Sequence, residues 1–225
     1  MALQFIKSSS PSVGEAELQR LLSSRLSAGK RLLWIVTGGS NVPITIRVMS
    51  AIDSPLTKNL HLLLSDERYG YVNHLDSNYF QLINGGLDLK QATFAPILTG
   101  VDFKPTLDHF AELFESEISW ADEVIGQLGI GSDGHIAGIL PGSTELESHE
   151  LVVGYEAAPY SRLSLSLEAL KRINLSYVFC FGQNKHEALT RVKTGGEQLS
   201  SLPALILNTI NKVKVYNDFL EGTSN

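Results

Sequence analysis

Several features that often reveal where a protein works are scarce or missing in this sequence. Cys180 is the single cysteine among 225 residues, so no internal disulfide bond can form. No apolar run approaches the roughly 20 residues that a membrane-spanning helix needs. The first residues lack the basic start and apolar stretch of a signal peptide. We therefore expect a soluble, cytoplasmic protein without a membrane partner.

Positive charge is also sparse and scattered. The chain has 18 lysines and arginines against 24 aspartates and glutamates, which gives a formal net charge of −6. Because no dense cluster of basic residues appears, we expect no nucleic-acid partner. The histidines, the cysteine and the acidic residues show no spacing typical of metal ligands, so neither a metal nor another cofactor is predicted. An anionic substrate would require a few well-placed cations.

Short apolar runs alternate along the chain with segments of helical periodicity. Several runs show little alternation between apolar and polar residues, which is typical of strands covered on both faces. This order predicts an α/β fold with a mostly parallel, Rossmann-like sheet and helices on both faces. No repeat or clear linker interrupts the pattern, so residues 1–225 are predicted to form a single domain. The expected strands are 31–37, 60–65, 123–130, 177–181 and 213–216, and the expected helices are 15–26, 42–51, 77–83, 106–119 and 185–192.

A glycine-rich turn follows the first predicted strand. Sheets of this kind bind ligands where loops leave the carboxyl ends of the strands. Gly38, Gly39 and Ser40 lie at such a point, directly before a predicted helix. Glycines let the backbone approach a ligand closely, and a helix start suits a phosphate group. A plain turn between strand and helix explains the motif about equally well.

Charged residues follow the second predicted strand. Arg68 could bind a phosphate or a carboxylate through two parallel hydrogen bonds, and Asp66 lies at the same strand end. A solvated loop with a local ion pair is the alternative. Slightly further on, Asp76 or Ser77 is predicted to cap the next helix.

The most specific pattern is the segment 129–137, Gly-Ile-Gly-Ser-Asp-Gly-His-Ile-Ala, which leaves a predicted strand. Its glycines allow unusual dihedral angles and place Asp133 and His135 two residues apart. An imidazole can take up and return a proton near neutral pH, and a carboxylate can fix its tautomer. We predict a catalytic role for this pair. The other histidines are predicted to be structural or exposed: His61, His74, His109, His149 and His186.

Two further cations lie beside predicted strands. Arg162 begins an alternating segment, Arg-Leu-Ser-Leu-Ser-Leu, and Lys185 follows the apolar run 177–181 where a helix opens. Both could supply positive charge to a pocket, although each alone is more typical of the surface. Cys180 lies inside that apolar run and is predicted to be a buried core residue.

Together and in this order, these segments resemble the family of 6-phosphogluconolactonases and glucosamine-6-phosphate deaminases. The segment 129–135 matches the family's G-x-G-x-D-G-H signature, while segments 66–68, 76–79 and 162–167 are similar to the lactonase branch. Deaminases typically follow the histidine with Asn-Glu-Pro, whereas this chain has Gly-Ile-Leu-Pro-Gly at 138–142. The chain also departs from the family at Asn41, Ile136 and Gly138, where hydroxyl-bearing residues are usual.

The resemblance implies hydrolysis of 6-phospho-D-glucono-1,5-lactone to 6-phospho-D-gluconate, a step of the pentose phosphate pathway. His135 would act as general base on water, and loop N–H groups at 38–40 would stabilise the oxyanion. The phosphate would be bound by Arg68, Arg162 and Lys185. Two alternatives stay open: a deaminase or isomerase of an amino-sugar phosphate, and a sugar-phosphate-binding protein without turnover. The oligomeric state is open as well.

Overall fold

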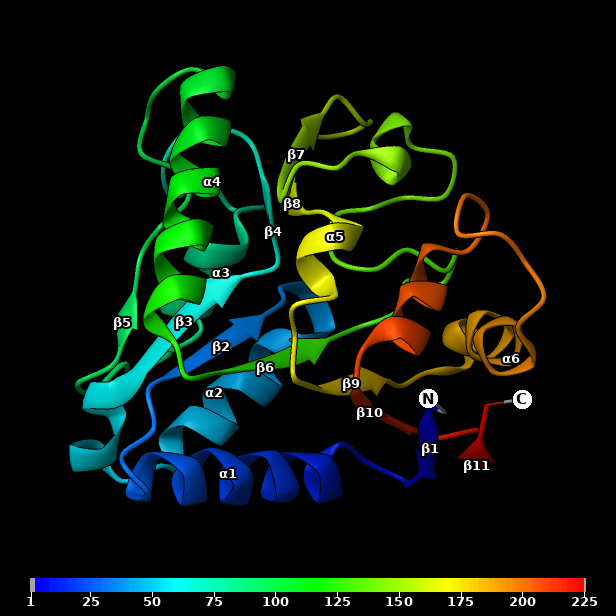
Figure 1. Cartoon of the computed structure of the whole chain (residues 1–225), viewed down its shortest axis with the longest axis horizontal. Helices are drawn as coiled ribbons and strands as arrows, with labels where there is room; N and C mark the ends of the chain where they lie inside the picture. Colours follow the sequence, from blue (N-terminus) through cyan, green and yellow to red (C-terminus); the bar gives the residue numbers. More distant parts are fainter. Residues whose placement is uncertain (1–2, 225) are drawn as a thin grey trace.

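A large, eight-stranded sheet forms the centre of the computed structural model, which describes residues 3–224 (Figure 1). Its strand order is β11-β1-β10-β9-β6-β2-β3-β5, and each pair is parallel except β1 with β11. The prediction of a mostly parallel α/β sheet is confirmed. The strands are β1 (Gln4–Lys7), β2 (Leu32–Val36), β3 (Leu60–Leu64), β5 (Thr93–Phe94), β6 (Glu123–Leu128), β9 (Leu175–Cys180), β10 (Lys212–Asn217) and β11 (Gly222–Thr223).

Helices cover both faces of this sheet, as predicted. In the view of Figure 1, α1 and α2 lie below the sheet, and α4 and α5 lie above it. Every residue of β2 is buried, as are all but the first residues of β6 and β9. Apolar residues therefore fill these strands without alternation. The helices are α1 (Ser12–Ser27), α2 (Val42–Ser50), α3 (Asn78–Asn84), α4 (Phe103–Trp120), α5 (Leu167–Leu170) and α6 (His186–Thr194).

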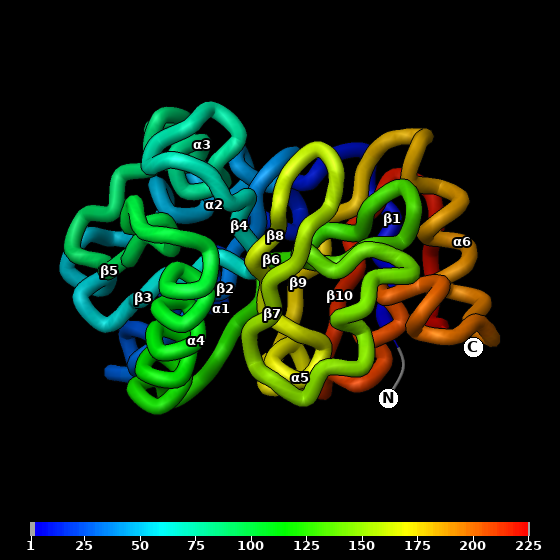
Figure 2. Tube along the Cα trace, turned by 90° about the horizontal axis from the view of Figure 1, so that it is seen from above, coloured from blue at the N-terminus to red at the C-terminus, as the bar shows by residue number. Residues whose placement is uncertain are grey.

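A second, antiparallel sheet of three strands lies over the centre of the large one (Figure 2). Its order is β4-β8-β7, formed by β4 (Asp66–Arg68), β7 (Val152–Tyr155) and β8 (Arg162–Leu165). The chain passes from one sheet to the other at Ser65, whose N–H donates to Val36 O and whose carbonyl accepts from Leu165 N. Residues 66–68 were expected in a loop; they form a strand because β8 pairs with them.

Element boundaries differ from the sequence prediction by a few residues. Helix α4 begins three residues before the expected start, so Pro105 lies within its first turn. Strand β6 ends at Leu128, two residues early, which adds length to the loop that carries His135. Ser77 caps α3 by accepting a hydrogen bond from Phe80 N at 3.1 Å, as predicted. Cys180 is buried at the end of β9, and burial raises the pKa of its thiol to about 12.

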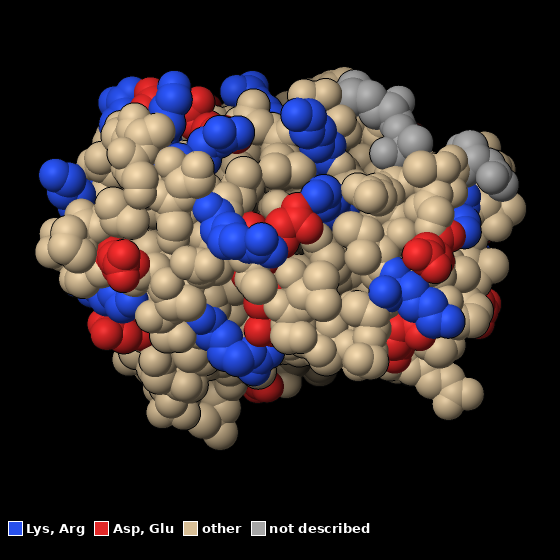
Figure 3. All heavy atoms as spheres, turned by 90° about the horizontal axis from the view of Figure 1, so that it is seen from below, with Lys and Arg blue, Asp and Glu red and all other residues tan. Residues whose placement is uncertain are grey.

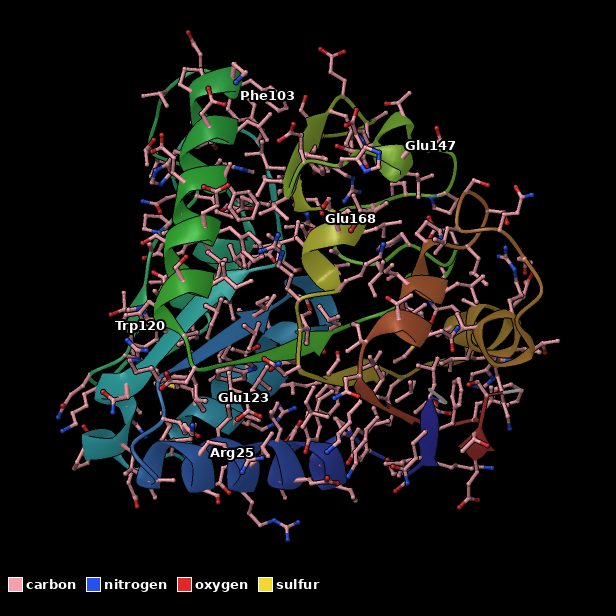
Figure 4. The ribbon with its side chains drawn as sticks, viewed as in Figure 1. Arg25, Phe103, Trp120, Glu123, Glu147 and Glu168 are labelled. Atoms are coloured by element: carbon pink, nitrogen blue, oxygen red, sulfur yellow. The ribbon has the colours of Figure 1, made fainter. Side chains whose placement is uncertain are left out.

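Charged side chains connect the helices to the amino ends of the strands. Arg25 of α1 contacts Glu123 at the start of β6, with Nε and Oε2 3.0 Å apart (Figure 4). His61 of β3 lies 2.6 Å from Glu117 of α4 through Nδ1, and its ring stacks on Trp120. Acidic and basic groups are scattered in small groups of both signs over the face shown in Figure 3. None of the helices between residues 3 and 224 has the length and apolar character needed to cross a membrane.

Helix α1 packs closely against two aromatic rings of the sheet at Gly14. A Cβ atom at this position would lie 2.6 Å from Phe179 Cε1 and 2.7 Å from Tyr216 Cγ. Both rings are buried and belong to neighbouring strands, so neither can move aside freely. The absence of a side chain at residue 14 therefore sets how closely α1 approaches β9 and β10.

We predict that Gly14→Ala destabilises the protein by about 1–3 kcal/mol, the usual cost of overpacking a core. Alanine by itself favours a helix by roughly 1 kcal/mol over glycine, so a net loss would show that the steric clash dominates. Ser24→Ala, at an exposed position of the same helix, is the control. Urea unfolding measures both, and a Gly14→Ala protein as stable as the parent would contradict the packing described.

Candidate active site

One cavity brings together loops from both sheets. It opens where chains leave β2, β6 and β9 of the large sheet and where β4 and β8 of the small sheet begin. Every residue predicted to bind substrate lines it, together with His135; Asp133 contacts His135 but is not among the lining residues. The lining residues are Thr37, Gly38, Gly39, Ser40, Asn41, Asp66, Arg68, Asn78, Gly129, Ile130, Gly131, His135, Ala137, Arg162 and Lys185.

His135 and Asp133 face each other, a relation that the sequence alone could not establish. His135 Nδ1 lies 2.6 Å from Asp133 Oδ1, which also accepts a hydrogen bond from His135 N at 3.1 Å. The hydrogen bond from the imidazole holds the pKa of the Asp133 carboxyl well below its usual range, although partial burial opposes this shift. Because Asp133 stays ionised, Nδ1 carries the proton and donates it, leaving Nε2 as the basic nitrogen.

Two positions in the loop that carries His135 require glycine for structural reasons. A Cβ atom on Gly131 would lie 2.0 Å from His135 Nδ1, so a side chain there would displace the imidazole. Gly134 has a φ of +90°, a conformation that residues with a side chain rarely adopt. The loop closes through hydrogen bonds from Gly131 N to His135 O and from Gly134 N to Gly131 O. The backbone thereby places Asp133 and His135 on one side of a tight bend.

The turn after β2 meets the start of α3 at the cavity floor. A Cβ atom on Gly38 would lie 1.9 Å from Asn78 Oδ1, so only glycine allows this approach. Asn78 is buried and donates from Nδ2 to Asp66 O at 2.9 Å and to Asp66 Oδ2 at 3.3 Å. Ser65 Oγ donates to Asp66 Oδ1 at 2.7 Å. The Asp66 carboxylate is therefore oriented from both sides before any ligand binds.

Three cations line this cavity without forming an ion pair within residues 3–224. Arg68 of β4 and Arg162 of β8 are direct cross-strand partners, and Lys185 reaches the cavity from the loop after β9. None of the three forms an ion pair with a carboxylate within residues 3–224. The Nε atoms of both arginines are buried without a hydrogen-bond partner. Like charges directly opposite each other destabilise a sheet, so this arrangement favours a bound anion.

Sequence reasoning did not identify Asn78 or Glu67 as contributors to the site. The similarity of 76–79 to the lactonase branch was the available signal for Asn78, which was expected only within a helix. Glu67 is fully buried, and its carboxylate accepts hydrogen bonds from the backbone N–H groups of Arg68, Asn78 and Tyr79 and from the Ser77 hydroxyl. Burial raises the pKa of this carboxyl, and the four hydrogen bonds oppose that rise. Glu67 thus joins β4 to the start of α3.

The remaining titratable groups lie outside the cavity. His149 is exposed, as expected, whereas His186 is half-buried and bonds to Asp218 through Nε2 at 3.2 Å instead of facing solvent. His74 is buried and lies 2.9 Å from the Arg68 carbonyl through Nε2. Within residues 3–224, no group of three or more His, Cys, Asp or Glu side chains is arranged to hold a metal ion.

Chemically, the cavity combines a base with an anion-binding wall. A basic nitrogen held by a carboxylate can move a proton, and three cations in the same cavity can hold an anionic substrate. The fold and site thus define an α/β protein suited to acid–base chemistry on a phosphorylated small molecule.

Comparison with known proteins gives the family. The family model for glucosamine-6-phosphate isomerases/6-phosphogluconolactonase matches residues 12–215, and the chain belongs to this family. A curated relative, the GDH/6PGL endoplasmic bifunctional protein of Oryctolagus cuniculus, is 33% identical over 122 residues. That match covers 50% of this chain and 15% of the relative, so it spans only a small part of the bifunctional protein.

Solved structures agree on the fold. A 6-phosphogluconolactonase from Shewanella baltica superimposes with a TM-score of 0.78 at 23% identity, covering 96% of this chain and 97% of that one. A 6-phosphogluconolactonase from Thermotoga maritima gives a TM-score of 0.71 at 22% identity, covering 96% and 98% of the two chains. At these identities the likeness establishes the fold.

We predict that Glu67→Gln lowers the free energy of unfolding by about 1–3 kcal/mol, the cost of leaving buried donors unsatisfied. The amide NH₂ of glutamine would face N–H donors that now meet a carboxylate oxygen. Chemical denaturation measures the loss, and Glu115→Gln, at an exposed position of α4, is the control. If both variants unfold at the same denaturant concentration, the assigned role of Glu67 is wrong.

Proposed function

We propose that this chain hydrolyses 6-phospho-D-glucono-1,5-lactone to 6-phospho-D-gluconate. The observation that supports this most strongly is the pair Arg68 and Arg162: they are cross-strand partners, form no ion pair within residues 3–224 and line the same cavity as His135. A phosphate dianion would neutralise the arginines, and Lys185 adds a third contact. Membership of the family, the similarity of residues 66–68 and 162–167 to its lactonase branch and the missing carboxylate after His135 support a lactone as the reacting group.

In the mechanism that follows, His135 Nε2 removes a proton from a water molecule as the water oxygen attacks the lactone carbonyl carbon. The carbonyl oxygen becomes an oxyanion, which N–H groups of the 38–40 turn or a nearby cation stabilise. When the tetrahedral centre collapses, the bond from that carbon to the ring oxygen breaks. The imidazolium returns its proton to the leaving ring oxygen. Asp133 stays ionised throughout, holds the ring through Nδ1 and stabilises the imidazolium.

Replacement of the base tests this mechanism directly. We predict that His135→Ala lowers kcat by about 100- to 10,000-fold, the usual contribution of a general base. The lactone also opens without an enzyme, so the spontaneous rate is subtracted in each assay. His149→Ala, which removes an exposed histidine, is the matched control and keeps the parent rate. A His135→Ala protein with unchanged catalysed turnover would disprove the assignment.

Replacement of one arginine tests whether Arg68, Arg162 and Lys185 bind the phosphate group. A lost charge-assisted contact costs ~1.5–3 kcal/mol, so Arg162→Gln should raise KM for the phosphorylated lactone about ten- to hundredfold. The same variant should not lower the free energy of unfolding, because it removes a repulsion with Arg68. Arg172→Gln, at an exposed position, is the control. The measurement compares the change in KM for 6-phospho-D-glucono-1,5-lactone with the change for unphosphorylated glucono-1,5-lactone. An equal change for both substrates would contradict phosphate binding at Arg162.

Turnover of glucosamine 6-phosphate would reveal the deaminase activity found in the other branch of the family. We expect no ammonia release, because residues 138–142 contain no carboxylate. A protein that binds 6-phospho-D-gluconate without catalysing lactone opening would instead be a sugar-phosphate-binding protein. A cytoplasmic location and the absence of a nucleic-acid partner stay predictions.

A further inference from the structure

A strained two-residue turn directly follows His135. Ile136 and Ile139 exchange backbone hydrogen bonds, with Ile136 N to Ile139 O at 3.3 Å and Ile139 N to Ile136 O at 2.9 Å. The turn between them consists of Ala137 and Gly138. Ala137 has a φ of +50°, a left-handed conformation that is uncommon for a residue with a side chain, and it lines the cavity. Such strain persists only where the surroundings hold the backbone in place.

The small sheet supplies the groups that hold this turn. Tyr155 Oη donates to Gly138 O at 2.5 Å and accepts from Leu140 N at 3.2 Å. Ser164 Oγ accepts from Gly138 N at 2.9 Å. A Cβ atom on Gly138 would lie 2.9 Å from Ser164 Cβ, so the turn and strand β8 are in direct contact. Two hydroxyl groups of the small sheet therefore bind the polar backbone atoms of the turn.

The same tyrosine is adjacent to one of the cations proposed to bind the phosphate. Tyr155 of β7 is the cross-strand partner of Arg162 in β8. The turn is also adjacent to the base, because His135 directly precedes Ile136 in the chain. The His135 carbonyl accepts a hydrogen bond from Gly131 N at 2.8 Å. Burial raises the pKa of Tyr155, against weaker effects of the Leu140 N–H and the Arg162 charge, so its hydroxyl remains protonated and can both donate and accept.

We propose that Tyr155 is a positioning residue for the hydrolysis proposed above, whose hydroxyl holds the 136–139 turn and thereby sets His135 relative to Arg162. The inference rests on the proposed function only for its catalytic consequence. A reaction between a base and a substrate bound at its phosphate depends on the distance between the two sites. A misplacement of about 1 Å can cost roughly a hundredfold in rate.

A double-mutant cycle between Tyr155 and Ala137 tests this role. We expect Tyr155→Phe to lower kcat between about tenfold and a hundredfold, with a smaller change in KM because the phosphate contacts remain. The loss should be smaller in an Ala137→Gly background, because glycine adopts the left-handed conformation without strain. Tyr69→Phe removes another hydroxyl bound to a backbone carbonyl, that of Val101, and is the control.

Amide hydrogen exchange of Gly138 and Ile139 gives a readout that does not depend on activity. We expect faster exchange of both amides in Tyr155→Phe and unchanged exchange in the strands of the large sheet. An equal loss of kcat in both backgrounds, or a lowered melting temperature with unchanged kcat and unchanged exchange, would overturn the proposal. If the parent protein does not catalyse lactone opening, the proposed function fails, and unchanged exchange of the turn amides in Tyr155→Phe would then overturn the positioning role independently.

Discussion

The repulsion between Arg68 and Arg162 is the constraint on which the site depends. The two residues are direct cross-strand partners in one ladder, and no carboxylate within residues 3–224 forms an ion pair with either of them. Such a pair lowers the stability of a sheet, so other contacts must hold its strands together. Glu67 joins β4 to the start of α3 through three hydrogen bonds, from Ser77, Asn78 and Tyr79. Tyr155 and Ser164 hold β7 and β8 to the turn after His135. The arginine pair at the anion-binding site lowers the stability of the protein, and the hydrogen bonds of the surrounding residues offset that loss.

The two sheets contribute different parts of the site. The large sheet supplies the base and the glycine turn through the loops after β6 and β2, as parallel sheets commonly do. The small sheet supplies both arginines and the oriented carboxylate of Asp66. The distance from base to phosphate therefore depends on how one sheet sits on the other. Gly138 lies at this contact, since a side chain there would meet Ser164 and Asp66. This gives a structural reason for glycine where the family usually has a hydroxyl-bearing residue.

The strands β2, β3, β6, β9 and β10 of the large sheet and the loops of the site could be predicted because their signals are local, whereas β1, β5 and β11 were not predicted. Unbroken apolar runs identify strands buried on both faces, and glycines beside polar residues identify the loops that follow. The alternating segment that begins at Arg162 indicated β8, but the small sheet was missed because β4 has only three residues and becomes a strand through β8, about 100 residues away. Asn78 and Tyr155 were missed for another reason: their contacts with Asp66 and Gly138 join residues 12 and 17 positions apart, and residue spacing does not show how those loops and strands pack. The orientation of Asp133 depends on glycine dihedral angles that residue spacing does not specify.

The supply of protons in the cavity favours lactone opening over the chemistry of the deaminase branch. Asp66 is the one carboxylic acid among the residues that line the cavity, and Ser65 and Asn78 already orient it. Asp133 is engaged with His135, which keeps its pKa low and prevents it from carrying a proton near neutral pH. His135 Nε2 is thus the group in the cavity best suited to accept and return a proton. Lactone hydrolysis needs nothing more, because the proton taken from water is the proton that the departing ring oxygen requires. A reaction that needs a second acid would call for a carboxyl group in the segment 138–142, and that segment contains none in this chain.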